Sequence, residues 1–213
     1  MSLVITERKT SNIPLLASKS YSAVCTSAIY LGEQFSQYDK RKQGKYVNQC
    51  MFIFEIPSER VEIDGESKPR WISSKRMTAL LGERSALGQF ISSWCGESIK
   101  TINLVDLLGK GAILAVSQKE TSAGSKYNSI ESITGIPDGI PVPKPESELL
   151  AFDADEPDME VLEKLPTWIQ DIIKKSTQFA ENPPMQEVAT PEPSGDKTNK
   201  QQSNEDDGEE CPI

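Results

Sequence analysis

Alternation of apolar and polar positions dominates the chain between residues 20 and 136, where β-branched and aromatic side chains are frequent. This period of two predicts β-strands, because successive side chains of a strand point to opposite faces. We expect five strands: Ser20–Gly32, Lys45–Pro57, Pro69–Met77, Gly111–Glu120 and Lys126–Pro137. The second becomes continuously apolar at Met51–Phe54, which predicts a strand buried on both faces.

A helical period interrupts this pattern after the third strand. Apolar residues recur at three- and four-residue spacing between Leu80 and Trp94 and form one stripe. Ser85 suits the N-cap and Gly96 the position just past the end. The sequence therefore predicts a helix at Arg84–Cys95.

The predicted order is three strands, one helix and two strands, which is the order of an OB-fold, a five-stranded Greek-key barrel. Other small barrels share this order and remain alternatives. A further helix is expected within Leu165–Phe179, where Pro166 fits a first turn. The expected fold class is mainly β: an OB-fold-like five-stranded barrel with a helix between strands 3 and 4, plus a C-terminal helix and a disordered acidic tail.

Composition divides the chain into four segments. Residues 1–19 form an N-terminal arm, residues 20–137 the OB-fold-like domain, residues 138–180 a Pro-rich and acidic extension with the C-terminal helix, and residues 181–213 the tail. The tail is rich in Pro, Glu, Ser, Asn, Gln and Lys and has few large apolar residues. Because such a composition cannot bury enough surface to offset its ordering entropy, we expect it to be disordered.

The formal net charge of −9 is unevenly distributed along the chain. Residues 1–145 carry 18 Lys and Arg against 14 Asp and Glu, a net of +4. Residues 146–213 carry 5 against 18, a net of −13. A mildly basic body joined to a strongly acidic tail is compatible with nucleic-acid binding by the body, which a uniformly acidic protein would not be.

The inventory of reactive side chains argues against catalysis. Histidine is absent, so histidine-based chemistry is excluded. The four cysteines, Cys25, Cys50, Cys95 and Cys211, show no CxxC pairing and are interpreted as buried or incidental thiols. The acids between Asp153 and Asp158 lack a partner base and are interpreted as a solvated stretch rather than a Mg²⁺ site. We predict no enzyme activity, no metal and no cofactor.

No segment has the composition of a membrane anchor. No run approaches the ~18 apolar residues of a membrane helix, and the N-terminal "MSLVITERKT" lacks the hydrophobic stretch of a signal peptide. We expect a soluble protein of the cytoplasm.

Aromatic and basic residues are interleaved in two places, as a surface for single-stranded nucleic acid requires for stacking bases and attracting phosphates. The candidate binding residues are Phe35, Tyr38, Lys40, Arg41, Lys42, Lys45 and Tyr46 from the first inter-strand loop, and Arg70, Trp71, Lys75 and Arg76 from the third strand. In an OB-fold, this loop and the face of strands 2 and 3 bind oligonucleotides. We therefore expect the two groups to converge on one groove.

A structural interpretation exists for each part taken alone. Trp71 or Tyr46 could plug the core, and the basic loop after Tyr38 could be a solvated connection. The combination, at places appropriate to the fold, is what favours single-stranded DNA binding.

The chain ends in an acidic run followed by a small apolar tip. The residues concerned are Glu205, Asp206, Asp207, Glu209, Glu210, Pro212 and Ile213. Such carboxylates can occupy the cationic groove of the protein when DNA is absent, and a freed C-terminal carboxylate can be captured by a partner protein. The ending resembles the acidic tip of bacterial single-stranded DNA-binding proteins, which close with Asp residues and Ile-Pro-Phe. Here Cys211 replaces the isoleucine and Ile213 the phenylalanine.

The body resembles a family of small phage proteins grouped with DNA replication and recombination. The stretches that carry the resemblance are "AIYLGEQFSQY", "FEIP", "ALGQFISSWCG", "LLGKGAILAVSQ", "YNSIESITGIPDGIPVP" and "LPTWIQDIIKKS". The resemblance implies a phage protein that acts in the cytoplasm of an infected bacterial host. It identifies no contact residues.

Our hypothesis from the sequence is a phage single-stranded DNA-binding protein without sequence preference. Its acidic tail would compete with DNA and recruit replication or recombination proteins. One alternative is a protein-interaction adaptor whose aromatic residues are all structural. Another is a strand-annealing or recombination mediator, which would act as a homo-oligomer.

Overall fold

The computed structural model describes residues 13–37, 43–63 and 65–180, all of which belong to one compact unit. The N-terminal residues 1–12 and the predicted tail, residues 181–213, lie outside the described part. The prediction that the tail is disordered is therefore not tested.

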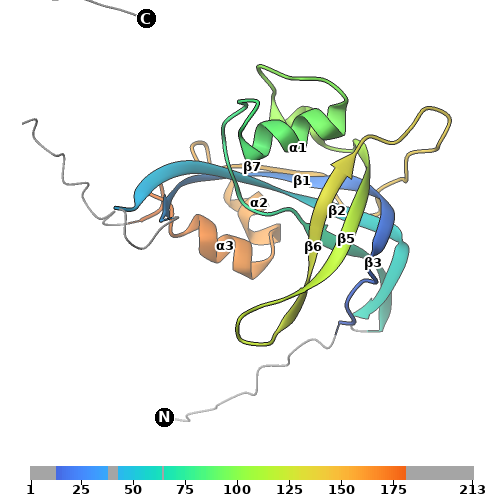
Figure 1. Cartoon of the computed structure of the whole chain (residues 1–213). Helices are drawn as coiled ribbons and strands as arrows, with labels where there is room; N and C mark the ends of the chain where they lie inside the picture. The colour runs from blue at the N-terminus through green and yellow to red at the C-terminus, as the bar shows by residue number, and fades with distance from the viewer. Residues whose placement is uncertain (1–12, 38–42, 64, 181–213) are drawn as a thin grey trace, which may run out of the picture. The chain divides into compact units, whose positions relative to one another are not determined.

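A mainly antiparallel seven-stranded sheet organises the described chain (Figure 1). Its strands are β1 (Lys19–Ser36), β2 (Lys45–Ile63), β3 (Glu66–Ser73), β4 (Met77–Thr78), β5 (Gly111–Glu120), β6 (Lys126–Thr134) and β7 (Leu150–Asp153). The main path runs β3-β2-β1-β5-β6, with β4 added beside β2 and β7 beside β1. Only the β1–β7 pairing is parallel. The mainly β class is confirmed, but the sheet is open between β3 and β6, so the predicted five-stranded barrel is not confirmed.

The second strand is longer than its sequence predicts, because Pro57 does not end it. β2 continues to Ile63, and its ladder with β3 shifts register between Ile56 and Arg60. Proline has no backbone N–H to give to a ladder and is tolerated at such an irregularity. The bulge therefore lets one strand pass through a residue that usually stops strands.

The expected third strand, Pro69–Met77, is divided in two by Ser74. The Ser74 backbone N–H donates to the Phe52 carbonyl at 2.8 Å, and its hydroxyl accepts from the Phe52 N–H at 2.9 Å. A side chain thus takes the place of a backbone carbonyl in the ladder. β3 ends before it, and the short β4 resumes beside β2 after it.

The helix after the third strand forms as predicted. Helix α1 spans Ala86–Cys95; the Ser85 hydroxyl accepts from the Gly88 N–H at 3.0 Å, and Gly96 adopts the left-handed conformation with φ 80°. Both ends therefore carry the caps expected from the sequence. A short 3₁₀ turn, η1 (Leu104–Leu107), follows before β5.

The acidic extension is more ordered than its composition suggests. After an extended Pro-rich arm, residues 137–148, the chain forms β7, helix α2 (Met159–Lys164) and helix α3 (Thr167–Ile173). Asp158 caps α2 by accepting from the Glu160 N–H at 2.9 Å. Asp153–Asp158 are therefore more than a solvated stretch, because this segment joins β7 to α2 and caps α2. The helix expected within Leu165–Phe179 is observed as α3, which is shorter than that range.

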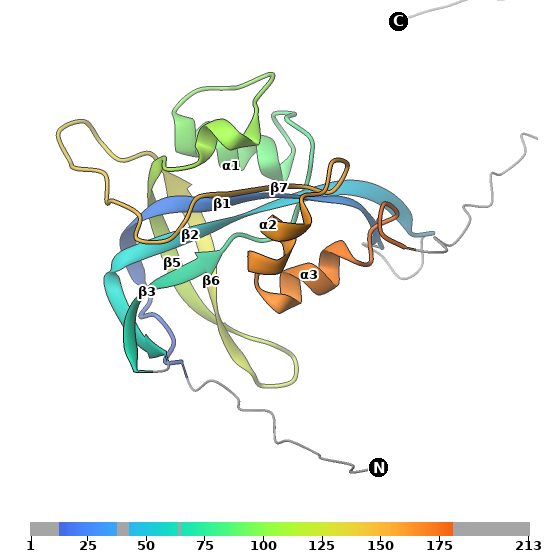
Figure 2. The same cartoon turned by 180° about the vertical axis from the view of Figure 1, so that it is seen from behind.

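The long β1–β2 ribbon has helices on both faces, with α1 on one side and α2 and α3 on the other (Figures 1 and 2). Phe52 and Phe54 belong to the cluster that contains Trp94 of α1. Met51 and Ile53 belong to a second cluster with α2 and α3. The continuous apolar run is thus explained, and the prediction of a strand buried on both faces is confirmed.

The alternation of inward-facing side chains along β1 shifts by one residue at an irregularity. β1 carries an irregularity between Cys25 and Ser27, opposite a regular stretch of β2. Cys25 and Ala28 therefore both belong to the α1-side cluster, while Ile29 belongs to the other.

No helix within the described ranges is long and apolar enough to cross a membrane.

Candidate nucleic-acid interface

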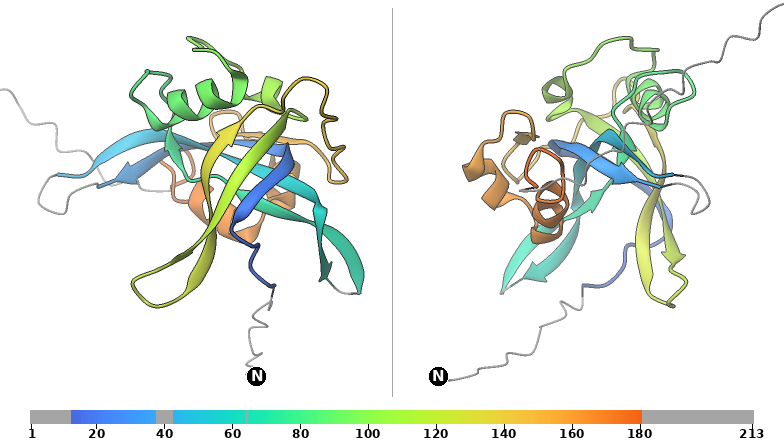
Figure 3. Two further views of the ribbon diagram at one scale, coloured as in Figure 1. Left: turned by 45° about the vertical axis from the view of Figure 1, so that its right-hand side comes forward. Right: turned by 90° about the vertical axis from the view of Figure 1, so that its left-hand side faces the viewer.

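The end of the β1–β2 ribbon carries three of the predicted binding residues. It extends beyond the other strands (Figure 3). There Phe35 pairs in register with Tyr46, and their rings meet edge-on at 5.5 Å between centroids. The Phe35 ring is 57% exposed and packs against Gly44, where a Cβ would collide with it. Lys45 is exposed and takes part in none of the ion pairs of the described residues.

The residues expected to complete this end are Tyr38, Lys40, Arg41 and Lys42, and they lie outside the described residues. The described part of the ribbon end therefore offers two rings and one cation. Because an exposed ring on a rigid ladder loses little freedom on stacking, this is a suitable place for a base to stack.

Arg70 and Trp71 lie elsewhere, on β3. The Arg70 guanidinium donates to the Pro14 carbonyl at 2.7 Å, and burial lowers its pKa. The Trp71 side chain is 51% exposed and forms a wall common to two cavities of about 310 and 150 Å³. The larger cavity also contacts Leu165 and Pro166 at the start of α3. Arg70 is thus engaged within the protein, and Trp71 faces an apolar surface.

The structure does not bring the ribbon end and Trp71 into one groove. Trp71 pairs with Glu55, nine positions along β2 from Tyr46, which is about 30 Å at ~3.3 Å per residue. Side chains alternate along a strand, so Tyr46 shares the α1 face with Phe52, whereas Glu55 and Trp71 are on the opposite face. The expected convergence is therefore not found.

Lys75 and Arg76 lie closer to the ribbon end than Trp71 does. They connect β3 to β4, between the Phe52–Ser74 contact and the Cys50–Met77 pair. This places them about 15–20 Å from Tyr46 along β2, beside the same face. Both side chains are exposed, and none of the ion pairs among the described residues involves either.

Lys75 and Arg76 line an open cavity of about 450 Å³ together with residues of α1 and β6. The acidic residue on its wall, Glu131, is compensated: its carboxylate accepts from Lys119 at 2.9 Å and from the Ser117 hydroxyl at 2.8 Å. These two hydrogen bonds lower the pKa of Glu131 to about 2. The Lys75 and Arg76 charges are therefore left uncompensated at this cavity.

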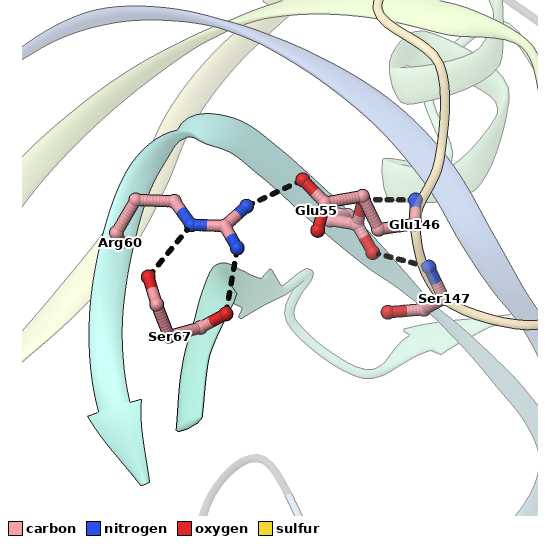
Figure 4. Close-up of polar contacts among 5 residues, drawn as sticks. All are labelled: Glu55, Arg60, Ser67, Glu146 and Ser147. Carbon is pink, nitrogen blue, oxygen red and sulfur yellow. Dashed lines mark hydrogen bonds and ion pairs between the residues drawn. The ribbon is translucent and has the colours of Figure 1, made fainter. Parts of the chain in front are cut away.

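A buried carboxylate on the opposite face was missed by the sequence reasoning (Figure 4). Glu55 is 0% exposed, and its two oxygens accept the backbone N–H groups of Glu146 and Ser147 at 2.7 and 2.9 Å. Arg60 then pairs with the Glu146 carboxylate and donates to the Ser67 carbonyl and hydroxyl. We call Glu55, Arg60, Glu146, Ser147 and Ser67 the arm clamp.

The arm clamp attaches the Pro-rich arm to β2 and β3. Because β7, α2 and α3 follow this arm along the chain, the clamp helps to position them. A signal for it exists in the sequence, because Glu55 is a single charge inside the apolar run "MFIFEIP". A charge at such a position must find strong hydrogen bonds when it is buried. Its partners could not be predicted, since they are backbone groups about 90 residues away.

The described cysteines and acids provide no reactive cluster. Cys25 and Cys50 are buried free thiols whose pKa values burial raises to about 12, and Cys95 is free and partly exposed. In the ranges that the structure covers, no group of three or more His, Cys, Asp or Glu could hold a metal ion. Tyr30 lies beside Asp153 and Asp155, and burial, followed by these acids, raises its pKa to about 12.

Comparison with known proteins identifies no relative. No family model, no curated protein and no solved structure matches this chain. The resemblance to phage replication and recombination proteins consequently remains a prediction from the residues quoted above.

Proposed function

We propose that this protein binds single-stranded DNA without sequence preference, along the α1 face from the ribbon end to Lys75 and Arg76. The observation that carries the proposal is the exposed Phe35 ring, held edge-on against Tyr46 beside Lys45, which forms no ion pair with any described residue. Bases stack on such rings, and phosphates are attracted to such cations. The ~20 Å from ring to cations would be spanned by a few nucleotides, which fits the small site sizes of single OB-folds.

We extend the proposal to the fold and interpret the open sheet as OB-like. β3 and β6, the two ends of the strand path, approach each other without a hydrogen-bonded ladder. An OB-fold is itself a partly open barrel with a helix after its third strand. The strand order and the place of α1 support this interpretation.

Low-salt binding to fluorescein-labelled oligo(dT), followed by anisotropy, tests the proposal. Phe35→Ala is expected to weaken binding by about tenfold, because one base stack is worth about 1–3 kcal/mol. Tyr127→Ala is the matched control: Tyr127 is 43% exposed but lies on β6, away from the ribbon end. Equal binding by Phe35→Ala and the wild type, or no binding by the wild type, would contradict the proposal.

The proposal includes the acidic tail, whose residues lie outside the described part of the chain. Its carboxylates would compete with DNA, and its tip would recruit replication or recombination proteins. Removing residues 203–213 is expected to tighten DNA binding at low salt. Weaker binding after truncation would rule out competition by the tail.

A protein-interaction adaptor is the second candidate, and Trp71 is the observation that favours it. Half-exposed tryptophans beside apolar cavities are frequent centres of protein interfaces. An adaptor would show no shift of oligo(dT) in a native gel at low salt. A strand-annealing mediator would instead bind DNA and self-associate, which sedimentation velocity with and without oligo(dT) would detect.

A further inference from the structure

The 450 Å³ cavity beside α1 has a volume typical of a small-ligand site, and its walls differ in chemistry. Lys75 and Arg76 form one side, Gln89, Phe90 and Ser93 of α1 another, and residues 130–133 of β6 the third. It thus lies at the seam where the strand path is open, with α1 across the end of β6 (Figure 1).

Phe90 gives the cavity an aromatic wall that the core holds in place. Its ring is stacked on Phe52, with an interplanar angle of 4° and 5.8 Å between centroids, and it meets Trp94 edge-on at 6.2 Å. Phe54 also lies against this ring, at 6.3 Å between centroids. Because Phe90 is partly exposed and lines the cavity, its accessible part offers a second flat group a surface to stack against.

Polar groups of the right kind surround this ring. Gln89 has an amide that both donates and accepts, and its one contact among the described residues is a 3.3 Å bond to the Glu83 carbonyl. The hydroxyls of Ser93 and Ser132 are exposed and make no hydrogen bond within the described ranges. Such groups can satisfy the hydrogen-bonding edge of a base whichever base is present.

The charges at the cavity favour an anionic ligand. Lys75 and Arg76 are free of ion pairs among the described residues, while Glu131 is neutralised by Lys119. An aromatic face, adaptable polar groups and two cations on one rim match the three parts of a nucleotide: its base, the edge of that base and its phosphate.

We propose that this cavity is a nucleotide subsite in which a base stacks on Phe90, contacts Gln89, Ser93 or Ser132, and carries its phosphate to Lys75 and Arg76. The inference deepens the proposed function and rests on it, because the cavity continues the α1 face on which Phe35 and Tyr46 lie. The nucleotide is thus one unit of a bound strand. A free mononucleotide shares the same chemistry and is separated from the strand by the test.

Filling the cavity tests the subsite. Ser132→Phe places an aromatic side chain on its wall from an exposed position of β6, and Thr134→Phe is the matched control on the same strand outside the lining. Ser132→Phe is expected to weaken binding of oligo(dT) of 16 nucleotides by about tenfold, the effect of one lost stack, and Thr134→Phe by less than twofold. Equal affinities of the two variants would overturn the subsite.

A second variant keeps the test independent of folding in Ser132→Phe. Gln89→Ala leaves the cavity open and is favourable in a helix. It is expected to weaken binding of oligo(dA) and of oligo(dT) alike, by about threefold, the effect of one lost hydrogen bond. Unchanged affinities for both would remove Gln89 from the base-contacting set.

The outcomes separate the subsite from the proposed function. If Phe35→Ala loses binding and Ser132→Phe keeps it, the ribbon end binds DNA and the subsite is wrong. If the wild type binds thymidine monophosphate in equilibrium dialysis but no oligo(dT), the cavity is a mononucleotide site and single-strand binding is wrong. If the wild type binds neither probe, both proposals fall.

Discussion

The two faces of the β1–β2 ribbon are covered by different elements. On one face, α1 packs on Phe52 and Phe54 and leaves beside it a cavity with two uncompensated cations. On the other, α2 and α3 pack on Met51 and Ile53, and the arm clamp ties down the segment that leads to them. Two cations near the second face are paired: Arg60 with Glu146 and Lys164 with Glu148.

This difference separates the charges that hold the fold together from those that are free to act on something else. Glu55 is 0% exposed and both of its oxygens hold backbone N–H groups, so it is not accessible to a ligand. Lys75 and Arg76 are exposed and form no ion pair with the described residues, so they remain accessible. Under the proposed function, DNA would bind along the α1 face. The arm clamp holds the C-terminal extension on the opposite face, which we call the clamped face and on which Trp71 is exposed.

The largest effect is expected from breaking the arm clamp. Glu55→Ala leaves the Glu146 and Ser147 N–H groups without their acceptors and opens a void in β2. The free energy of unfolding should fall by about 3 kcal/mol, since hydrogen bonds to a charged group contribute about 1.5–3 kcal/mol each and part of the loss is recovered by water. Urea unfolding measures the change.

Glu66→Ala is the control for the clamp, because Glu66 forms only an exposed ion pair with Lys68. It should change the stability by less than about 1 kcal/mol. Hydrogen exchange adds a local measure, since the Glu146 and Ser147 amides should lose protection in Glu55→Gln before the amides of α1 do. Simultaneous loss at both places would mean that the two faces open together rather than separately.

The next effect concerns the cations of the α1 face. If about four phosphates are neutralised, the slope of log K against log[salt] for single strands is about −3. Removing two contacts in Lys75→Ala/Arg76→Ala should reduce it to about −1.5, because each contributes about 0.7. Anisotropy titrations with oligo(dT) between 20 and 200 mM NaCl measure the slope.

Lys164→Ala is the matched control for this slope, as Lys164 is paired with Glu148 on the clamped face. Its slope should equal that of the wild type. A slope reduced equally by Lys164→Ala would show that net charge, rather than the α1 face, determines the salt dependence.

Most of the individual elements could be predicted from local patterns. The capped helix at α1 and the strands β5 and β6 follow from periodicity and from Ser85 and Gly96, because local hydrogen bonds decide them. β7 and α2 were missed because "LAFD" and "MEVLEK" are short and acidic in context, and they become ordered only by packing on β1 and on each other. The open seam is likewise a property of distant pairings.

The candidate site was predictable by residue type and not by geometry. Phe35, Lys45 and Tyr46 are neighbours in register, so sequence proximity placed them correctly together. Trp71 and Arg70 were joined to them by analogy with a barrel, and the register of β2 with β3 separates them. Gln89, Ser93 and Ser132 gave no signal, because a cavity between a helix and a later strand has no pattern along the chain.

A smaller effect is expected from pH at the cavity rim. The pKa of Glu131 is about 2 in the folded protein and about 4.5 ordinarily, so its interactions stabilise the fold above the ordinary value and are lost as pH falls towards 2. The wild type should therefore melt higher than Glu131→Gln at pH 6, and the difference should disappear between pH 4.5 and 2. In a Lys119→Met background the difference at pH 6 should be smaller, since Lys119 supplies the first hydrogen bond. A constant difference across this range would show that the Glu131 charge is not involved.

The smallest effect tests whether the two faces are independent. Cys25 and Cys50 both belong to the α1-side cluster, and their pKa values of about 12 leave almost no thiolate at pH 8. In a Cys211→Ser background, Ellman's reagent should therefore modify Cys95 first, and the two buried thiols in a slow phase, only when this cluster opens.

Glu55→Gln loosens the opposite face, so it should change the rate of this slow phase by less than about threefold if each face opens alone. A slow phase accelerated in proportion to the global loss of stability would instead show that the thiols are reached only through complete unfolding, which couples the clamped face to the α1 face.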